Sequence, residues 1–348
     1  MEMYSLTKLY DSDTRFLPAH HQPAILIDLA ASRGIDTHRL LRGTHIFYED
    51  VIKGQLQISI NQYLQLIDNA QKLFGARDLS FLFGSRLLPG NYDAFTMALN
   101  NAANLQQALE ILVEFAAVLS PLVRPTVFFD DKHCYIRWLG GFANLSQKRF
   151  AIEATYLAVA SFSRGHIGKR VPWQFYFSYE KPDYSEQYDV YFGSRVQFNT
   201  HMDLLRVERS YLAEPWLQAS QTAQHLAQQR AKEYYQALPS QTGFIDYLYQ
   251  YVWDNIGNPP TLESLAQHLC TSPATLKRRL KANHLTFQQL IDKVRKHVAI
   301  QLFYLRGFSN DQVAETLGFH DVNNFRRSFK RWTGVTPSSF RGSLSSPA

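Results

Sequence analysis

Two similar segments of the chain carry Arg side chains at matching positions, and the second also carries Asn323. They read TLESLAQHLCTSPATLKRRLKANH (261–284) and SNDQVAETLGFHDVNNFRRSFKRW (309–332), and the second repeats the first at an offset of 48 to 49 residues. A guanidinium group donates two parallel hydrogen bonds to O6 and N7 of guanine, and an Asn amide pairs with adenine in the same way. Arg278 and Arg327 are therefore candidates for reading guanine, and Asn323 is a candidate for reading adenine.

Positive charge is concentrated around these segments. Residues 241–348 hold 13 Lys+Arg and 7 Asp+Glu, which accounts for the whole formal charge of +6, whereas the 240 residues before them hold 23 of each sign. This confinement favours a polyanionic partner over general surface solvation, although solvation remains the alternative for any single Arg. Lys281, Lys330 and Arg331 are candidates for phosphate contacts, which position a protein on DNA without reading its sequence.

The first segment predicts two short helices joined by a tight turn. Thr261 is a helix cap, and Ser272 followed by Pro273 begins a second helix at once. In that helix Leu276 and Leu280 face the core, while the basic side chains face outward. Such a pair with a basic second helix is a helix-turn-helix. For one copy alone, a plain helical hairpin in a bundle is the alternative.

The second segment repeats the arrangement, and a long helix joins the two. Ser309 and Gln312 form a capping box, Gly318 ends the first helix and Asp321 caps the next. A continuous apolar stripe predicts a linker helix over 287–306. Twenty helical residues span about 30 Å, and successive major grooves on one face of B-DNA lie about 34 Å apart. A rod of this length fits two recognition helices in adjacent grooves.

These residues carry a resemblance to a known family. Residues from about 244 to 341 resemble the double helix-turn-helix domain of AraC/XylS-family transcription regulators, most closely in LGFHDVNNFRRSFKRWTGVTPSSFR (317–341) and also in SPATLKRRL (272–280). The resemblance implies that one major groove faces Ala274, Lys277, Arg278 and Lys281, and that the next faces Val322, Asn323, Arg326 and Arg327. Cys270 departs from the pattern, because the family usually has Gly there, and we expect slight strain in that turn.

The residues ahead of this region predict an α+β domain, with helices first and a small sheet after. We expect helices at 23–33, 59–75, 104–119, 150–164 and 214–238, a hairpin of 126–130 and 134–138, and strands at 173–179 and 194–199. The breaker-rich stretch PSQTG (239–243) places the boundary so that residues 1–238 form this domain and 239–348 form an all-α domain. LLRGTHIF (40–47), VPWQFYF (171–177) and VQFN (196–199) resemble the arabinose-binding-like regulatory domain found in one branch of the same family.

That second resemblance implies effector sensing or dimerisation. Candidates for lining an apolar effector pocket are Phe128, Trp138, Trp173 and Phe175, and Arg124 is a candidate for holding an anionic ligand. The alternative for most of these aromatic residues is plain sheet core. The expected partners are double-stranded DNA, RNA polymerase, a small-molecule effector and a second copy of the chain, paired through this domain or the helix around 215–236. The competing interpretation is a ligand-independent regulator whose front domain only dimerises or contacts RNA polymerase. The effector, the target promoter and the choice between activator and repressor stay open.

Other protein classes find no support in the sequence. GxSxG, HExxH, the P-loop and GxGxxG motifs are missing, and neither Cys134 nor Cys270 stands in the Pro-Cys-His-Arg signature of a DNA-repair methyltransferase, so we expect no enzyme and no cofactor. The cysteines form no CxxC pair, and the adjacent His20 and His21 do not by themselves share a metal, so we expect no metal site. Without a signal peptide or a membrane-length apolar run, a cytoplasmic protein that joins the nucleoid on DNA is expected.

Overall fold

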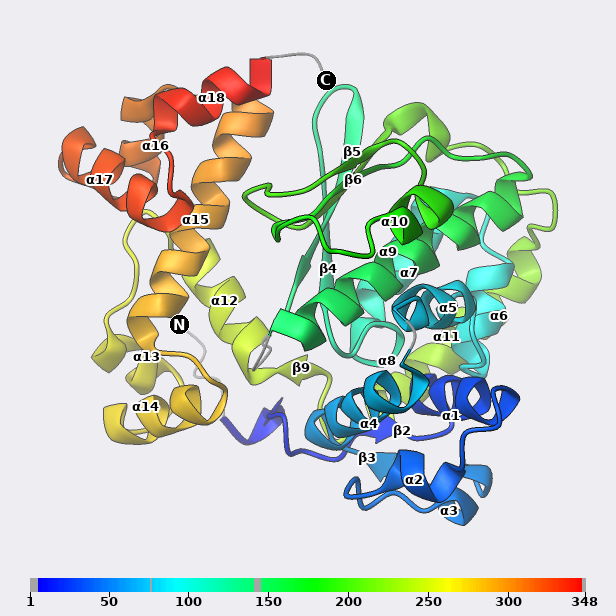
Figure 1. Cartoon of the computed structure of the whole chain (residues 1–348). Helices are drawn as coiled ribbons and strands as arrows, with labels where there is room; N and C mark the ends of the chain where they lie inside the picture. The colour runs from blue at the N-terminus through cyan, green and yellow to red at the C-terminus, as the bar shows by residue number, and fades with distance from the viewer. Residues whose placement is uncertain (1–5, 76, 141–144, 346–348) are drawn as a thin grey trace. The chain divides into compact units, whose positions relative to one another are not determined.

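The computed structural model describes residues 6–75, 77–140 and 145–345 (Figure 1). They divide into two compact units, one from Tyr10 to Gln241 and one from Thr242 onward that also includes Leu6–Leu9. Of the described residues, the first unit mixes helices and strands and the second is helical apart from one short strand pair, which confirms the predicted fold class. The division falls close to the predicted boundary after residue 238, and the roles assigned to the two parts stay predictions.

The N-terminal unit begins with helices and adds a sheet later in the chain (Figure 1). Its helices are α1 (Gln22–Ser32), α2 (Thr37–Leu41), α3 (Tyr48–Ile52), α4 (Ile60–Phe74), α5 (Leu79–Leu87), α6 (Ala94–Asn100), α7 (Leu105–Glu114), α8 (Ala116–Leu119), α9 (Leu145–Ile167), α10 (Glu186–Tyr191), the 3₁₀ turn η2 (Arg209–Tyr211) and α11 (Gln221–Ala237). Its main strands are β4 (Arg124–Phe129), β5 (His133–Leu139), β6 (Gln174–Tyr176), β7 (Val196–Gln197) and β8 (Leu204–Glu208).

These five strands form one sheet in the order β4-β5-β8-β6-β7. The pairs β4–β5, β5–β8 and β6–β8 are antiparallel, and β6–β7 is parallel. The hairpin β4–β5 confirms the prediction, whereas the strand expected at 173–179 is shorter and β8 was not predicted at all. Elsewhere β2 (Leu17–Pro18) pairs with β3 (Gln57–Ile58), and β1 (Leu9–Tyr10) pairs with β9 (Thr242–Gly243).

The long helix α9 organises the core of this unit. Tyr156 on α9 is fully buried, with its ring centroid 5.0 Å from Trp138 on the sheet. On another side α9 crosses α5 closely, since a Cβ added to Gly84 would lie 2.5 Å from the carbonyl oxygen of Ala154. Such an approach needs a residue without a side chain. Both neighbours of α9 are therefore held by direct contact with its buried face.

Local sequence signals set some helix ends and not others. Helix α4 begins at a capping box, in which the Ser59 hydroxyl accepts from the backbone N–H of Gln62 and the Gln62 side chain accepts from that of Ser59. The single helix expected over 104–119 is wrong, because the chain leaves helical geometry at Phe115 and resumes as α8. The Phe115 ring is buried against Phe95 and Tyr235, so tertiary packing decides this break.

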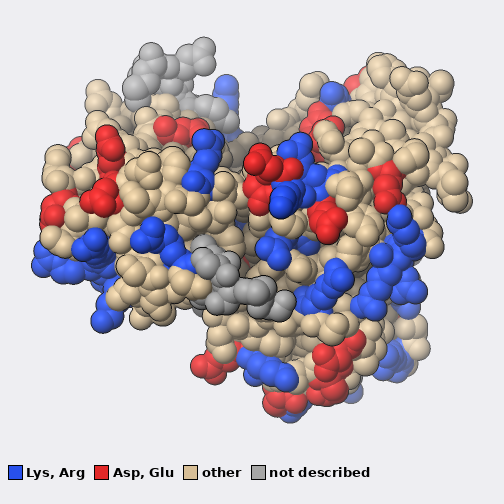
Figure 2. All heavy atoms as spheres, turned by 90° about the horizontal axis from the view of Figure 1, so that it is seen from above, with Lys and Arg blue, Asp and Glu red and all other residues tan. Residues whose placement is uncertain are grey.

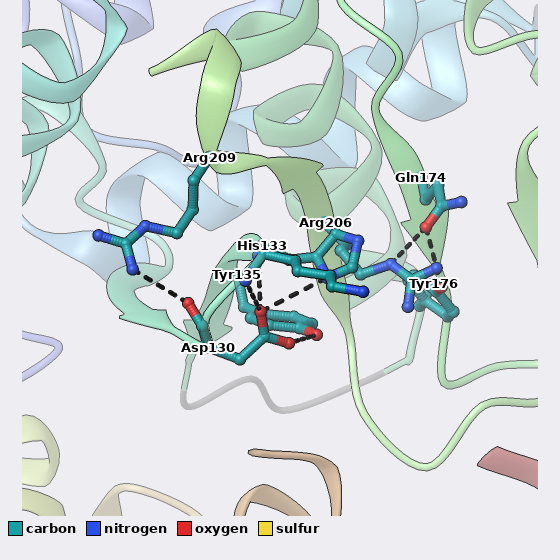
Figure 3. Close-up of polar contacts among 8 residues, drawn as sticks. Asp130, His133, Tyr135, Gln174, Tyr176, Arg206 and Arg209 are labelled. Carbon is teal, nitrogen blue, oxygen red and sulfur yellow. Dashed lines mark hydrogen bonds and ion pairs between the residues drawn. The ribbon is translucent and has the colours of Figure 1, made fainter. Parts of the chain in front are cut away.

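A polar network covers the face of the sheet opposite the core (Figure 3). Asp130, in the β4–β5 turn, accepts hydrogen bonds from the Tyr135 hydroxyl at 2.6 Å and from the backbone N–H groups of Lys132 and His133 at 2.8 and 2.6 Å. Burial alone would raise the pKa of the Asp130 carboxyl, but these hydrogen bonds hold it below its ordinary value. Farther along, the Arg206 guanidinium donates to the Gln174 side chain (Figure 3). The Asp130 carboxylate thus fixes the β4–β5 turn by accepting three hydrogen bonds.

The C-terminal unit is built from helices (Figure 1). They are α12 (Phe244–Asp254), α13 (Leu262–His268), α14 (Pro273–Ala282), α15 (Phe287–Arg306), α16 (Asn310–Thr316), α17 (Val322–Thr333) and α18 (Pro337–Ser345), and the 3₁₀ turn η1 (Leu6–Lys8) belongs to the same unit. The linker helix predicted over 287–306 is confirmed to the residue. Helix pairs α13–α14 and α16–α17 each pack together, and α15 contacts both members of the second pair.

Candidate nucleic-acid interface

The first helix pair presents α14 by means of a local cap and two buried leucines. The Ser272 hydroxyl accepts from the backbone N–H of Thr275 at 3.1 Å, and Pro273 occupies the first helical position. Leu276 and Leu280 are fully buried and anchor one side of the helix. The opposite side is exposed and carries the predicted DNA-facing residues of this pair, namely Ala274, Lys277, Arg278 and Lys281.

The second pair presents α17 in the same way with different residues. The Asp321 carboxylate accepts from the backbone N–H groups of Asn323 and Asn324 at the start of the helix. Phe325 and Phe329 are fully buried on its inner side. The predicted residues on the outer side are Asn323, Arg326, Arg327, Lys330 and Arg331, all exposed, and the half-buried Val322. Each pair therefore offers one helix whose outer face is free to meet a ligand.

Contacts on the outer face of α17 distinguish its arginines. The Arg327 guanidinium donates to the side-chain oxygen of Asn324 at 2.7 Å, which orients it along the helix surface. Arg331 forms an ion pair with Asp292 of α15 at 3.2 Å. A phosphate contact by Arg331 must therefore compete with this carboxylate. Arg326 remains exposed beside them.

The linker helix α15 ties the second pair together through residues that the sequence analysis missed. Phe303 is buried, and its ring centroid lies 5.5 Å from Phe329 and 5.8 Å from Phe340. The Arg295 guanidinium stacks over Phe319 at 4.6 Å, and burial lowers the pKa of Arg295. The helical period places these side chains on the inner side of α15, but the sequence gives no sign of their aromatic partners.

Arg279 is a basic residue of α14 that turns inward. Its guanidinium lies 4.3 Å from the ring centroid of Phe244 and donates to the backbone carbonyls of Leu6 and Leu9 at 3.1 and 2.8 Å. The first described residues of the chain are thus bound to the C-terminal unit by this side chain. Adjacent arginines in KRRL have opposite roles, since Arg278 is exposed and Arg279 is half-buried.

In Figure 2 several Lys and Arg side chains lie together at the lower left, next to Asp and Glu side chains. The described members of α14 and α17 that contribute Lys or Arg and are exposed are Lys277, Arg278, Lys281, Arg326, Arg327, Lys330 and Arg331. Several cations on two capped helices give the positive potential and the hydrogen-bond donors that bind a polyanion. Two helix-turn-helix pairs with exposed basic second helices define a DNA-binding protein of the double helix-turn-helix class.

Comparison with known proteins agrees with this class. Residues 34–216 match the model of the arabinose-binding domain of the AraC transcription regulator, and residues 265–343 match a helix-turn-helix domain model. The chain belongs to the AraC family of DNA-binding transcription regulators and carries an arabinose-binding-like N-terminal domain.

The chain matches known regulators over most of its own length and theirs. The ornithine utilization regulator of Pseudomonas aeruginosa is 28% identical over 319 residues, which cover 91% of this chain and 94% of the relative. An uncharacterized HTH-type transcriptional regulator of Mycobacterium tuberculosis is 24% identical over 328 residues, with coverages of 91% and 94%. Among solved structures, the regulator CdpR of Pseudomonas aeruginosa aligns over 92% of this chain and 98% of its own, at 17% identity and a TM-score of 0.40.

The structure places the predicted effector residues in several different environments. Trp138, Trp173 and Phe175 are buried in the core, and the Trp173 indole donates to the Ser163 hydroxyl at 3.0 Å. Phe128 stacks on Tyr135 on the other face of the sheet. The Arg124 guanidinium donates to the carbonyl of Gln241 at 2.9 Å. Among the described residues that line the cavities of about 740, 360 and 20 Å³ in this unit, none of the five predicted residues appears.

The cavity of about 360 Å³ is lined by both basic and acidic side chains. It lies between the end of α4 and the first turns of α5 and α9, and its lining includes Arg77, Ser80, Arg149, Glu153 and Tyr184. Glu153 is buried and accepts hydrogen bonds from the hydroxyls of Ser80, Tyr184 and Tyr188. Burial raises the pKa of Glu153 despite these bonds. Arg149 stacks over Tyr179 at 5.1 Å, so cationic and anionic groups face one hollow.

The described part of the chain holds no helix that is both long enough and apolar enough to cross a membrane.

Proposed function

We propose that this regulator binds DNA with α14 in one major groove and α17 in the next. The observation that carries the proposal is the pair of capped helices, each anchored by two buried apolar residues and exposed on its basic side. The 20 residues of α15 give a rod of about 30 Å, against a groove repeat of about 34 Å. The two recognition helices, joined by α15, then cover about two helical turns of DNA.

Within this interface each residue has a distinct proposed role. Arg278 and Arg327 read guanine through their guanidinium groups, and Asn323 reads adenine through its amide. Lys277, Lys281, Arg326, Lys330 and Arg331 contact phosphates or the groove edge, and Ala274 and Val322 leave room for close approach to base edges.

The test is a comparison of selected DNA sequences. Binding sites are enriched from a random duplex library with the wild-type chain, and affinities of single-base variants of the best site are then measured for Arg327→Ala. We expect an affinity loss of about 1–3 kcal/mol and relaxed preference at one base position only. Arg230→Ala, which removes an exposed Arg of α11, is the matched control and should leave the sequence preference unchanged. An equal loss on every sequence would make Arg327 a phosphate contact.

We further propose that an effector of the amino-acid class binds the 360 Å³ cavity and controls DNA binding. The relative from Pseudomonas aeruginosa is named for ornithine utilization, and an amino acid carries both an ammonium and a carboxylate. The cavity offers Glu153 to a cation and Arg149 to an anion, and its size suits a small ligand. Arg77, also in the lining, is ion-paired with Asp183. Displacing a tyrosine hydroxyl from Glu153 by an ammonium would couple binding to the position of α10.

Thermal unfolding and DNA affinity, measured together against ornithine, arginine, lysine, glutamate and arabinose, test this proposal. We expect one amino acid to raise the melting temperature and to change DNA affinity in wild type. Glu153→Gln should lose that response, whereas Glu180→Gln, at an exposed position, should keep it. If no compound moves either quantity, the ligand-independent interpretation replaces the sensor.

Pairing of two copies of the chain completes the proposal. Helix α11 exposes Leu226 and Tyr234, eight residues apart and so on one helical face. We propose that this face pairs two copies of the chain. Light scattering should give a dimer mass that Leu226→Glu converts to a monomer; a monomer in wild type, with and without DNA, rejects the pairing.

A further inference from the structure

The start of α1 and the start of α6 bring together two histidines and one aspartate. His20 and His21 directly precede α1, and Asp93 directly precedes α6. One side-chain atom from each of the three residues, of the kind that ligates metals, lies within 4.8 Å of the others. Because 72 residues separate His21 from Asp93, the adjacent histidines looked isolated in the sequence. The fold supplies the third group.

The contacts in this cluster are longer than ordinary hydrogen bonds, although His20 and Asp93 lie within hydrogen-bonding reach of each other. The Nε2 atoms of His20 and His21 lie 3.4 and 3.5 Å from the same Asp93 oxygen, Oδ2. Ordinary N–H···O bonds are about 2.7–3.2 Å long. Two ligands placed about 2.0–2.1 Å from one tetrahedral Zn²⁺ are about 3.3–3.4 Å apart. Both histidine–Asp93 distances match that spacing, and the three candidate ligand atoms lie within 4.8 Å of one another.

His21 is a buried imidazole whose nitrogens lack partners. The residue is 1% exposed, and neither ring nitrogen has a hydrogen-bond partner among the described residues. Leaving such a polar group buried and unsatisfied costs about 1–3 kcal/mol. An imidazole nitrogen without such a partner is available as a metal ligand.

Asp93 directs its carboxylate at the histidines instead of capping its own helix. It occupies the N-cap position of α6, where Asp normally accepts from the helix N–H groups, yet it makes no such bond to a described residue. Its backbone has φ +52° and ψ −124°, a conformation that favours glycine. Its side chain is 65% exposed, so a metal ion and a water or further ligand can reach the site.

We propose that His20, His21 and Asp93 form a binding site for one divalent transition-metal ion of the zinc class. Two imidazoles and one carboxylate suit Zn²⁺, Co²⁺ or Ni²⁺ and leave a coordination position open to solvent. The bound ion links the beginning of α1 to the beginning of α6, which itself packs against α11. This site is separate from the effector cavity and from the DNA-binding helices, and it does not depend on the function proposed for either.

The experiment titrates the chelator-treated full-length chain with Co²⁺ and, by competition, with Zn²⁺. We expect one equivalent to bind, with the visible absorption of Co²⁺ held by nitrogen and oxygen ligands, and a rise in melting temperature. Asp93→Asn and His20→Gln should each lower affinity by about 100-fold or more, since each removes a ligand. His225→Gln, at an exposed position of α11, is the matched control and should bind as wild type does.

A second variant separates metal binding from folding. Asp93→Gly removes the ligand and relieves the backbone conformation, so the metal-free melting temperature should not fall while the metal-induced rise disappears. The proposal is overturned if wild type binds no stoichiometric metal, because the cluster is then only a pair of histidines beside an acid. It is equally overturned if Asp93→Asn and His20→Gln bind as tightly as wild type, because the ion then sits on other histidines.

Discussion

The two turns of the DNA-binding unit permit a matched test of backbone strain. Gly318 ends α16 and Cys270 follows α13 at the equivalent position, 48 residues earlier. Both adopt the left-handed conformation, with φ +70° at Gly318 and +52° at Cys270. A Cβ added at Gly318 would lie 2.3 Å from the carbonyl oxygen of Gly257. The left-handed conformation is thus occupied by Gly, which it favours, in one turn and by Cys, which it disfavours, in the other.

Opposite effects follow for the two substitutions. Gly318→Ala adds about 1–2 kcal/mol of left-handed strain, and backbone must move by most of an ångström to relieve the contact, so we expect about 3–4 kcal/mol of destabilisation in total. Cys270→Gly removes about 1–2 kcal/mol of strain and gives back about 0.5–1 kcal/mol to the greater freedom of the unfolded chain. A net gain of about 0.5–1 kcal/mol remains.

Urea unfolding of the full-length chain, followed by tryptophan fluorescence, to which Trp253 and Trp332 of the C-terminal unit contribute, measures both effects. DNA affinity should fall for Gly318→Ala, because the turn sets the start of α17, and should hold for Cys270→Gly. A loss below about 1 kcal/mol for Gly318→Ala, or a loss of any size for Cys270→Gly, would refute the assignment of strain to these turns.

Three further predictions concern single side chains. Arg279→Met should destabilise the C-terminal unit by about 1–3 kcal/mol, because it loses the stacking on Phe244 and two hydrogen bonds to the carbonyls of Leu6 and Leu9. Limited proteolysis should then cleave the segment that contains these two residues more readily. An unchanged free energy of unfolding contradicts the prediction. Asp130→Asn should cost about 1 kcal/mol at neutral pH. Since the folded pKa of Asp130 is lowered, this difference from wild type should shrink as the pH falls through that pKa, and a constant difference in acid titrations rejects it. Ser309→Ala should lower the stability of α16 by about 1 kcal/mol in thermal unfolding, and no change would mean that the cap is dispensable.

The DNA-binding unit could be predicted in detail because its signals are local. Capping residues act within three positions, as Thr286 and Gln289 do at the start of α15. Apolar spacing then fixes which face is buried, which leaves Arg278 and Arg327 outside without knowledge of any distant contact. The same spacing could not separate Arg278 from Arg279, because the partners of Arg279 lie about 270 residues away.

The N-terminal unit could be predicted only in outline. Strand β8 pairs with β5 and β6, yet its five residues give a weak local pattern, so its place in the middle of the sheet was missed. The core tryptophans looked like pocket residues because an apolar side chain reads alike in a core and in a cavity. Conversely, the buried Glu153 gave no signal, since its three hydroxyl partners come from α5 and from the segment around α10.

The sequence by itself determined that the protein carries two basic helix-turn-helix units on a 20-residue rod, since helix caps, periodicity and charge act over a few residues. The tertiary structure alone decided which side chains meet across the chain. It gathered Glu153 with its hydroxyls, set Arg279 on the first residues of the chain, and brought Asp93 to His20 and His21. These three clusters depend on contacts between segments that are distant in the sequence. Such contacts form when the segments pack around a shared core, and no local sequence pattern encodes them.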